Sequence, residues 1–191
     1  MAEPALKQMT VEEFFDWQER QDMNYELVHG VPVPTVKAMT GASNRHDRVT
    51  VNAIVSLGNQ LRGKPCRPHT ADQSVRTVVG TRRPDLLIEC GKPHPRSLEA
   101  DDPRVVFEIM SPSTWRFDRV HKIEEYKQHP KIRVILLVDT EAPQVTVWRK
   151  VEQEWRLEKF AGLDAVVALP EIGAALPLAE LYADIDWSET N

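Results

Sequence analysis

Cysteine is scarce in this sequence, and long apolar runs are missing. Its 191 residues include two cysteines, Cys66 and Cys90, without C-x-x-C spacing, so neither a disulfide framework nor a cysteine metal site is expected. Isolated thiols fit a reducing cytoplasm. The N-terminus MAEPALKQMT has no basic start followed by an apolar run, and no stretch of about 18 apolar residues occurs. We therefore expect a cytoplasmic protein with no signal peptide, transmembrane helix or membrane partner.

An excess of positive charge is also absent. The formal net charge is -5 and the pI is about 5.7, so a nucleic-acid partner would need a local basic surface. Glycine is outnumbered by proline, 8 to 14, which favours many fixed turns and a sheet-containing fold over a helix bundle. With 41% hydrophobic and 28% charged residues, the chain predicts one domain, at about 10–185.

The first third of the chain predicts a helix, a hairpin and a second helix. Thr10 and Glu13 form a capping box for a helix at about 10–21. Two short strands within 25–33 flank a tight turn that requires Gly30. Ser43 caps the second helix, whose apolar positions recur every four residues until Gly63: Val49, Ala53, Leu57 and Leu61.

The rest of the chain predicts a mixed sheet. Apolar or loosely alternating runs indicate central strands at 72–79, 85–88 and 105–110, with a surface connection at 91–103 between the last two. A helix at about 115–128 precedes the aliphatic run 132–139, which is typical of a strand buried on both faces after a crossover helix. Residues 144–160 predict a second hairpin, and the tail adds a short strand near Val166 and a helical turn at 177–182.

Two acids lie within or beside the apolar strands. Asp85 opens one strand and Glu108 is embedded in the next, in the run VVFEIM. A carboxylate at such a position must be paired, hydrogen-bonded or bound to a cation. Oxygen ligands of this kind suit magnesium or manganese rather than zinc. The two acids therefore predict a Mg²⁺ site, with Mn²⁺ as the alternative ion.

Polar residues on the following helix could approach the same place. Asp118, Lys122 and Tyr126 are four residues apart and share one helix face, which Arg119 flanks. Near a phosphodiester, an ammonium can orient or help to deprotonate the attacking water and offset developing charge. Two acids and a lysine are typical of a phosphodiesterase.

With these residues in place, the sequence resembles the Uma-type restriction endonucleases, a branch of the PD-(D/E)XK nuclease superfamily. The match spans most of the chain. It depends on the following residues: Tyr25 to Gly30 (YELVHG), His46, Arg83-Pro84-Asp85, Glu108 to Thr114 (EIMSPST), Asp118, Lys122, Tyr126 and Val138-Asp139.

The resemblance implies a restriction-endonuclease-like α/β core with a mixed sheet flanked by helices, an N-terminal helix and hairpin, and a C-terminal hairpin. In it, Asp85 and Glu108 look like the metal-binding acids, and Glu26 would be an additional acid. The usual motif has a lysine two residues after the second acid, where this chain has Met110. The matching lysine would then be Lys122, with Lys127 as the second candidate.

The substrate implied by the resemblance is DNA. His46, Arg83, Arg119 and Tyr126 are the candidate substrate-binding residues, and arginines near the acids in sequence could form a local positive rim. A homodimer through the exposed edges of the 144–160 hairpin is a further hypothesis. The alternative function is a nuclease fold without catalysis, acting as a nucleic-acid-binding or assembly module.

Each site residue also has a purely structural interpretation. Asp85 could pair with Arg82 or Arg83, and Glu108 with a buried arginine. Other candidates could be ordinary surface or structural groups: Lys122 in an i,i+4 pair with Asp118, Glu26 on the outer side of its hairpin, and His46 as a hydrogen-bonded histidine.

Overall fold

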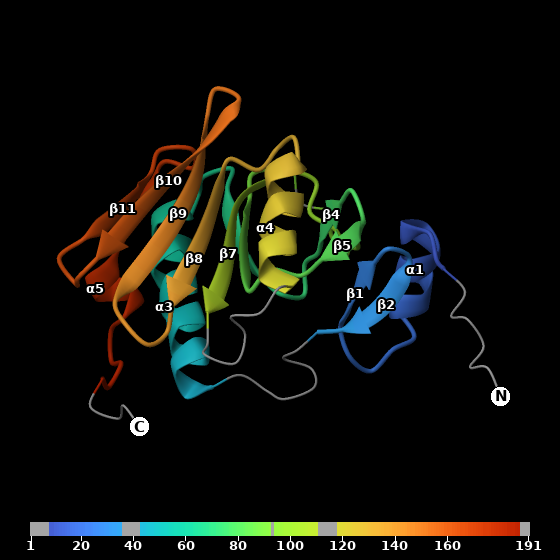
Figure 1. Cartoon of the computed structure of the whole chain (residues 1–191), viewed down its shortest axis with the longest axis horizontal. Helices are drawn as coiled ribbons and strands as arrows, with labels where there is room; N and C mark the ends of the chain where they lie inside the picture. The colour runs from blue at the N-terminus through green and yellow to red at the C-terminus, as the bar shows by residue number, and fades with distance from the viewer. Residues whose placement is uncertain (1–7, 36–42, 93, 111–117, 188–191) are drawn as a thin grey trace.

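The structure is a computed structural model that describes residues 8–35, 43–92, 94–110 and 118–187, with the side chains of 118–120 excepted. Within these ranges the chain forms three β-sheets and four helices (Figure 1). The helices are α1 (Val11–Gln18), α3 (Asn44–Leu61), α4 (Asp118–Gln128) and α5 (Leu178–Leu181). The predicted capping box of Thr10 and Glu13 and the predicted cap Ser43 are confirmed.

The central sheet has six strands in the order β10-β9-β8-β7-β6-β3. Its strands are β3 (Arg67–Thr70), β6 (Leu86–Glu89), β7 (Pro103–Met110), β8 (Val134–Asp139), β9 (Gln144–Val151) and β10 (Glu154–Ala161). Strands β7 and β8 are parallel and the other pairs are antiparallel, so the predicted mixed sheet is confirmed.

A separate antiparallel sheet has the order β2-β1-β5-β4, and β11 pairs with β12. These strands are β1 (Tyr25–Val28), β2 (Val31–Pro34), β4 (Val75–Thr77), β5 (Gly80–Arg82), β11 (Val166–Leu169) and β12 (Ala174–Pro177). The prediction of one central strand at 72–79 is wrong, because only Val75–Thr77 of this segment is a strand. It turns at 78–79 and pairs with β5 of the separate sheet, not with β6. The hairpin turn is confirmed, with positive φ angles at His29 and Gly30.

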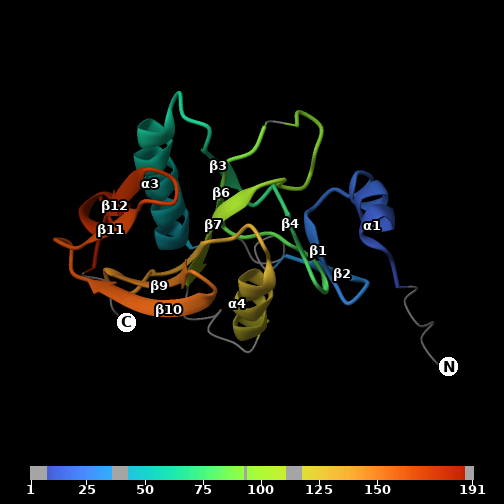
Figure 2. The same ribbon diagram turned by 90° about the horizontal axis from the view of Figure 1, so that it is seen from above.

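Helices cover both faces of the six-stranded sheet, as Figure 2 shows for α3 and α4. The larger core cluster joins the apolar side of α3 and the α5 region to residues such as Ile88 and Phe107. A smaller cluster on the other face joins Tyr126 of α4 to Val106 and Ile135. Alternation along β7 therefore directs Glu108, like Val106, to the α4 face. In the described ranges, no helix combines the length and the apolar character needed to cross a bilayer.

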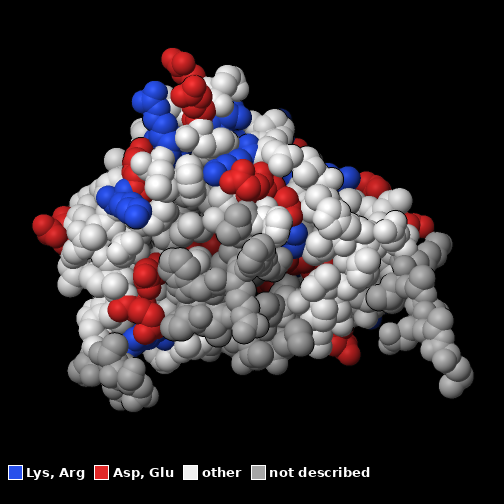
Figure 3. Space-filling view, viewed as in Figure 1, with Lys and Arg blue, Asp and Glu red and all other residues white. Residues whose placement is uncertain are grey.

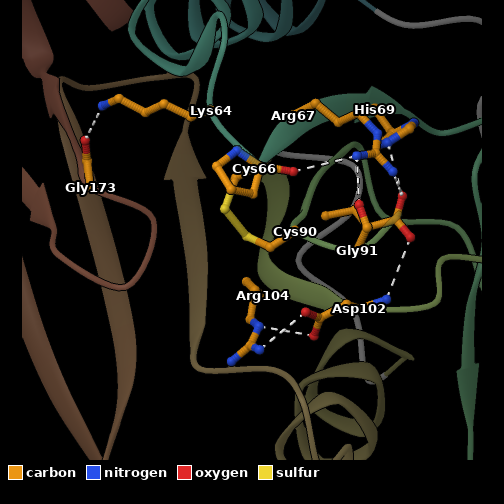
Figure 4. Close-up of a disulfide and its surroundings, with 11 residues drawn as sticks. Lys64, Cys66, Arg67, His69, Cys90, Gly91, Asp102, Arg104 and Gly173 are labelled. Carbon is orange, nitrogen blue, oxygen red and sulfur yellow. Dashed lines mark hydrogen bonds and ion pairs between the residues drawn. A yellow bond between two sulfur atoms is a disulfide. The ribbon is translucent and has the colours of Figure 1, made fainter. Parts of the chain in front are cut away.

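Cys66 and Cys90 form a disulfide, so the expectation of two separate thiols is wrong (Figure 4). Their spacing in the sequence does not indicate that the two cysteines lie close together. Cys66 directly precedes β3 and Cys90 directly follows β6, and the antiparallel pairing of these strands brings both ends together. Because disulfides are typical of oxidising compartments, the cysteines do not support a reducing cytoplasm.

Loss of this disulfide should lower stability measurably. The bond closes a loop with a sequence separation of 24, and constraint of such a loop in the unfolded chain is worth about 3 kcal/mol. We expect the Cys66→Ser/Cys90→Ser variant to lose about this much free energy of unfolding in urea titrations. An equal midpoint for the oxidised, the reduced and the doubly substituted protein would contradict this expectation.

Candidate active site

The end of the β6–β7 pair positions two buried acids. Leu86 is the register partner of Phe107, so Asp85, just before β6, lies next to Glu108 of β7. Asp85 and Glu108 are 7% and 4% exposed. The Asp85 Oδ2 atom accepts a 2.5 Å hydrogen bond from the backbone N–H of Ile109. The structure thus places the two predicted metal ligands next to each other in register, Asp85 directly before β6 and Glu108 within β7.

Two residues of α4 approach Glu108 from the face of the sheet that α4 covers. The Tyr126 hydroxyl donates a 2.8 Å hydrogen bond to Glu108 Oε1, which differs from the arginine pair considered for this acid. Lys122, one helical turn earlier, lies close enough for the charge of Glu108 to act on its ammonium. Lys122 and Tyr126 of the predicted helix face therefore point at the predicted acids, and the side chain of Asp118 lies outside the described part of the structure.

The third predicted acid, Glu26, is buried in β1 and joins the same cluster. Its Oε1 atom accepts hydrogen bonds from Lys122 Nζ at 2.8 Å and from the backbone N–H of Arg83 at 2.9 Å. Its Oε2 atom accepts one from Arg82 at 3.2 Å. An outward-facing position for Glu26 is therefore wrong. Its carboxylate is paired with two cations, and this pairing links β1 to α4.

Sequence reasoning missed one member of this cluster, Glu125, and misassigned another, Arg82. The Arg82 Nε and Nη2 atoms donate to Glu125 at 2.8 and 2.5 Å, and the Thr77 hydroxyl donates to Glu125 at 2.9 Å. Arg82 pairs with Glu125 and Glu26 where a pair with Asp85 had been considered. One signal was available, because Glu125 is three residues after Lys122 and so lies near its helix face.

The charges of this cluster shift three pKa values upward. For Lys122, burial lowers the pKa, but the carboxylates of Glu108 and Glu26 outweigh burial and raise it overall. The pKa of Arg82 is likewise raised by Glu125 and Glu26 against the effect of burial. Burial and the charge of Glu108 raise the pKa of the Tyr126 phenol. Lys122 is therefore held as an ammonium and Tyr126 as a neutral hydrogen-bond donor.

His46 reaches the acids from the opposite helix. The Ser43 side chain caps α3 by accepting from the His46 backbone N–H, which fixes the first helical turn. The His46 Nε2 atom then lies 3.3 Å from Asp85 Oδ2. The α3 and α4 helices, on opposite faces of the sheet, therefore both contribute a side chain to the acid pair.

Arg83 and Arg119 are the two arginines predicted to bind substrate. Arg83 directs its guanidinium to main-chain carbonyls, and the side chain of Arg119 is not described. The buried Arg83 guanidinium donates to the main-chain carbonyls of Tyr25, Ala71 and Asp72, at distances from 2.5 to 3.1 Å. Its backbone N–H donates to Glu26 of the acidic cluster, and the charge of Glu26 also acts on the guanidinium. Arg119 belongs to α4, but its side chain lies outside the described part of the structure.

The acid pair matches the ligand chemistry of a hard dication. Magnesium keeps several waters and is held by one or two carboxylates together with substrate phosphates. Asp85 and Glu108 provide two such carboxylates. Within the described ranges, no group of three or more His, Cys, Asp or Glu side chains is arranged to hold a metal. In the described ranges, Asp85 and Glu108 are therefore the two carboxylates that could hold such a cation together with water and substrate.

Comparisons with known proteins find relatives along most of the chain. "Uncharacterized protein slr1290" of Synechocystis sp. is 26% identical over 179 residues, which cover 91% of each protein. "Uncharacterized protein sll1609" of the same organism is 23% identical over 173 residues, or 87% of this chain and 96% of that protein.

A solved structure and a family model also match the chain over most of its length. The crystal structure of "a putative nuclease belonging to DUF820" from Anabaena variabilis superposes with a TM-score of 0.73 at 17% identity, covering 92% of this chain and 98% of that one. It confirms the predicted nuclease-type α/β fold. The family model described as "Uma2: Putative restriction endonuclease" matches residues 11–179, which confirms the resemblance found in the motifs. The chain therefore belongs to the Uma2 family.

Proposed function

We propose that this protein hydrolyses phosphodiester bonds of DNA with the help of Mg²⁺ or Mn²⁺ held by Asp85 and Glu108. The observation that carries the proposal is the pair of buried acids, Asp85 and Glu108, which are neighbours in the register of β6 and β7, with the partly buried ammonium of Lys122 beside them. When bound, the cation would polarise the scissile phosphodiester and activate a water molecule. A nuclease active site needs these functions together.

Lys122 takes the place of the lysine that Met110 replaces in the motif. Its ammonium is fixed by Glu26 at 2.8 Å, so it offers a positioned positive charge to the phosphate and to the attacking water. Tyr126 orients Glu108 through its hydroxyl, and His46 lies at the correct distance to orient Asp85. Glu26 acts as the anchor of Lys122. Its additional role as a metal ligand stays a prediction.

The alternative is a nuclease fold that binds nucleic acid or assembles without cleaving. It is favoured by Met110 at the motif position. It is also favoured by the side chains of Arg82 and Lys122, which pair with the Glu26 carboxylate. The homodimer and the cytoplasmic location expected from the sequence also stay predictions.

A cleavage assay on the full chain separates the two functions. We expect the wild type to nick or linearise supercoiled plasmid DNA with Mg²⁺ or Mn²⁺, and to lose this activity in EDTA. Calorimetric titration of Mn²⁺ gives the second measurement, because a nuclease needs cation affinity that depends on Asp85 and Glu108. Cation binding without cleavage of single- or double-stranded DNA would support the alternative, and no cation binding would refute the proposal.

A further inference from the structure

The hairpin of β9 and β10 places three pairs of facing residues on the side of the sheet that α4 covers. Register partners share a face of a sheet. The pairs of interest are Trp148 with Leu157, Lys150 with Trp155, and Thr146 with Lys159. Trp148 and Trp155 pack against the cluster that contains Tyr126 of α4, which places all three pairs on this face. Figure 3 shows Lys and Arg side chains over β9 and β10, with Asp and Glu side chains near them, most clearly at the tip of the hairpin.

Charge is divided between the two faces of this hairpin. On the α4 face, the charged residues of both strands are Lys150 and Lys159. Glu158 lies on the opposite face, where it pairs with Arg149 at 3.1 Å. Neither lysine forms an ion pair with another residue in the described part of the chain, so both ammonium groups can contact an anion from outside.

A straight row of register partners connects this surface to the acid pair. Glu108 is opposite Leu137, Leu137 is opposite Thr146, and Thr146 is opposite Lys159. Three strand spacings separate Glu108 from Lys159, or about 14 Å. This distance corresponds to about four base-pair steps along a DNA axis. A duplex with its scissile phosphate at Glu108 would therefore reach Lys159.

Both tryptophans of this surface contact other residues of the protein. The lysines are therefore the side chains of this surface that can bind a ligand. The Lys127 ammonium lies 3.5 Å from the centre of the Trp148 ring and covers it. The Trp155 indole N–H donates to the Lys127 carbonyl at 3.1 Å, and the Lys150 ammonium lies over the Trp155 ring, 6.0 Å from its centre. Stacking on unpaired bases requires an open ring face, so these contacts favour phosphate binding and a double-stranded partner.

We propose that the lysine strip, formed by Lys150, Trp155, Leu157 and Lys159, binds the phosphate backbone of duplex DNA that extends from the acid pair. The proposal rests on the proposed function for its substrate class. Lys150 and Lys159 contact phosphates, and Leu157, which is 48% exposed, lies between them against the duplex. The strip increases affinity without sequence specificity, because phosphate contacts carry no base information.

The test measures binding of a fluorescein-labelled duplex by anisotropy in EDTA, so that it needs no cleavage. We expect Lys150→Gln/Lys159→Gln to lower affinity about tenfold and to reduce the salt slope of binding by about 2, one for each lost contact. The matched control, Arg62→Gln/Arg156→Gln, removes two exposed cations outside the strip and should bind as the wild type does.

The lysine strip would be overturned by wild-type protein that does not bind the duplex, by equal affinity in the strip variant, or by an equal loss in the control. A loss confined to single-stranded DNA would also contradict it. Failure of the proposed function looks different, because the wild type would then bind the duplex through the strip without cleaving it when Mg²⁺ is added.

Discussion

Replacement of Glu108 by glutamine should lower Mg²⁺-dependent DNA cleavage at least about a thousandfold while the protein remains folded. A bound cation contributes several kcal/mol of charge stabilisation to the transition state, and about 4 kcal/mol corresponds to a thousandfold in rate. Glutamine keeps the volume of Glu108 and an acceptor for the Tyr126 hydroxyl, so the local packing persists. Plasmid nicking rates and calorimetric Mn²⁺ titration give the measurements.

Glu89→Gln is the matched control for this variant. Glu89 is a buried acid, 5% exposed, at the far end of β6, where it pairs with Arg67 at 3.0 Å. Its replacement removes a buried charge without touching the acid pair, so cleavage by the folded fraction should stay near the wild-type rate. Wild-type cleavage by Glu108→Gln, or an equal loss in Glu89→Gln, would exclude the metal-binding role of Glu108.

Hydrophobic pattern alone was sufficient for much of the central sheet. The aliphatic runs that became β7 and β8 have few alternatives to burial on both faces, and the intervening helix makes a parallel pair the natural connection. Strand β3 was missed because its sequence, RPHT, has neither apolar alternation nor a buried run. Its strand conformation depends on pairing with β6, a contact between segments about 20 residues apart that no local pattern encodes.

The acids of the site were visible in the sequence because each conflicts with its apolar neighbours. Glu125 has no such contrast, since α4 is rich in charged residues along DRVHKIEEYKQ. Packing decides which of the two consecutive acids of α4 is buried: the Glu124 side chain is 58% exposed and that of Glu125 is 9% exposed. The ion pair of Arg82 with Glu125 thus depends on how α4 lies against β5, which periodicity does not determine.

Replacement of Arg82 by methionine should cost about 3–5 kcal/mol of unfolding free energy. The Arg82 side chain is 3% exposed and pairs with Glu125 and Glu26, which are also buried. Removal of the guanidinium leaves Glu125 as a buried carboxylate with only the Thr77 hydroxyl as a described partner, and breaking a buried pair from one side has this cost. Urea titration at neutral pH measures the loss.

Arg76→Met provides the comparison, because Arg76 also pairs with two acids, Glu12 and Glu99, but its side chain is 45% exposed. Exposed pairs contribute at most about 1 kcal/mol, so this variant should be nearly as stable as the wild type. A third variant, Arg82→Met/Glu125→Met, also removes the Glu125 carboxylate, which Arg82→Met leaves without its arginine. It should recover much of the lost free energy of unfolding. If Arg82→Met costs no more than Arg76→Met, the buried network does not hold α4 against β5, and Lys122 must be positioned by other contacts.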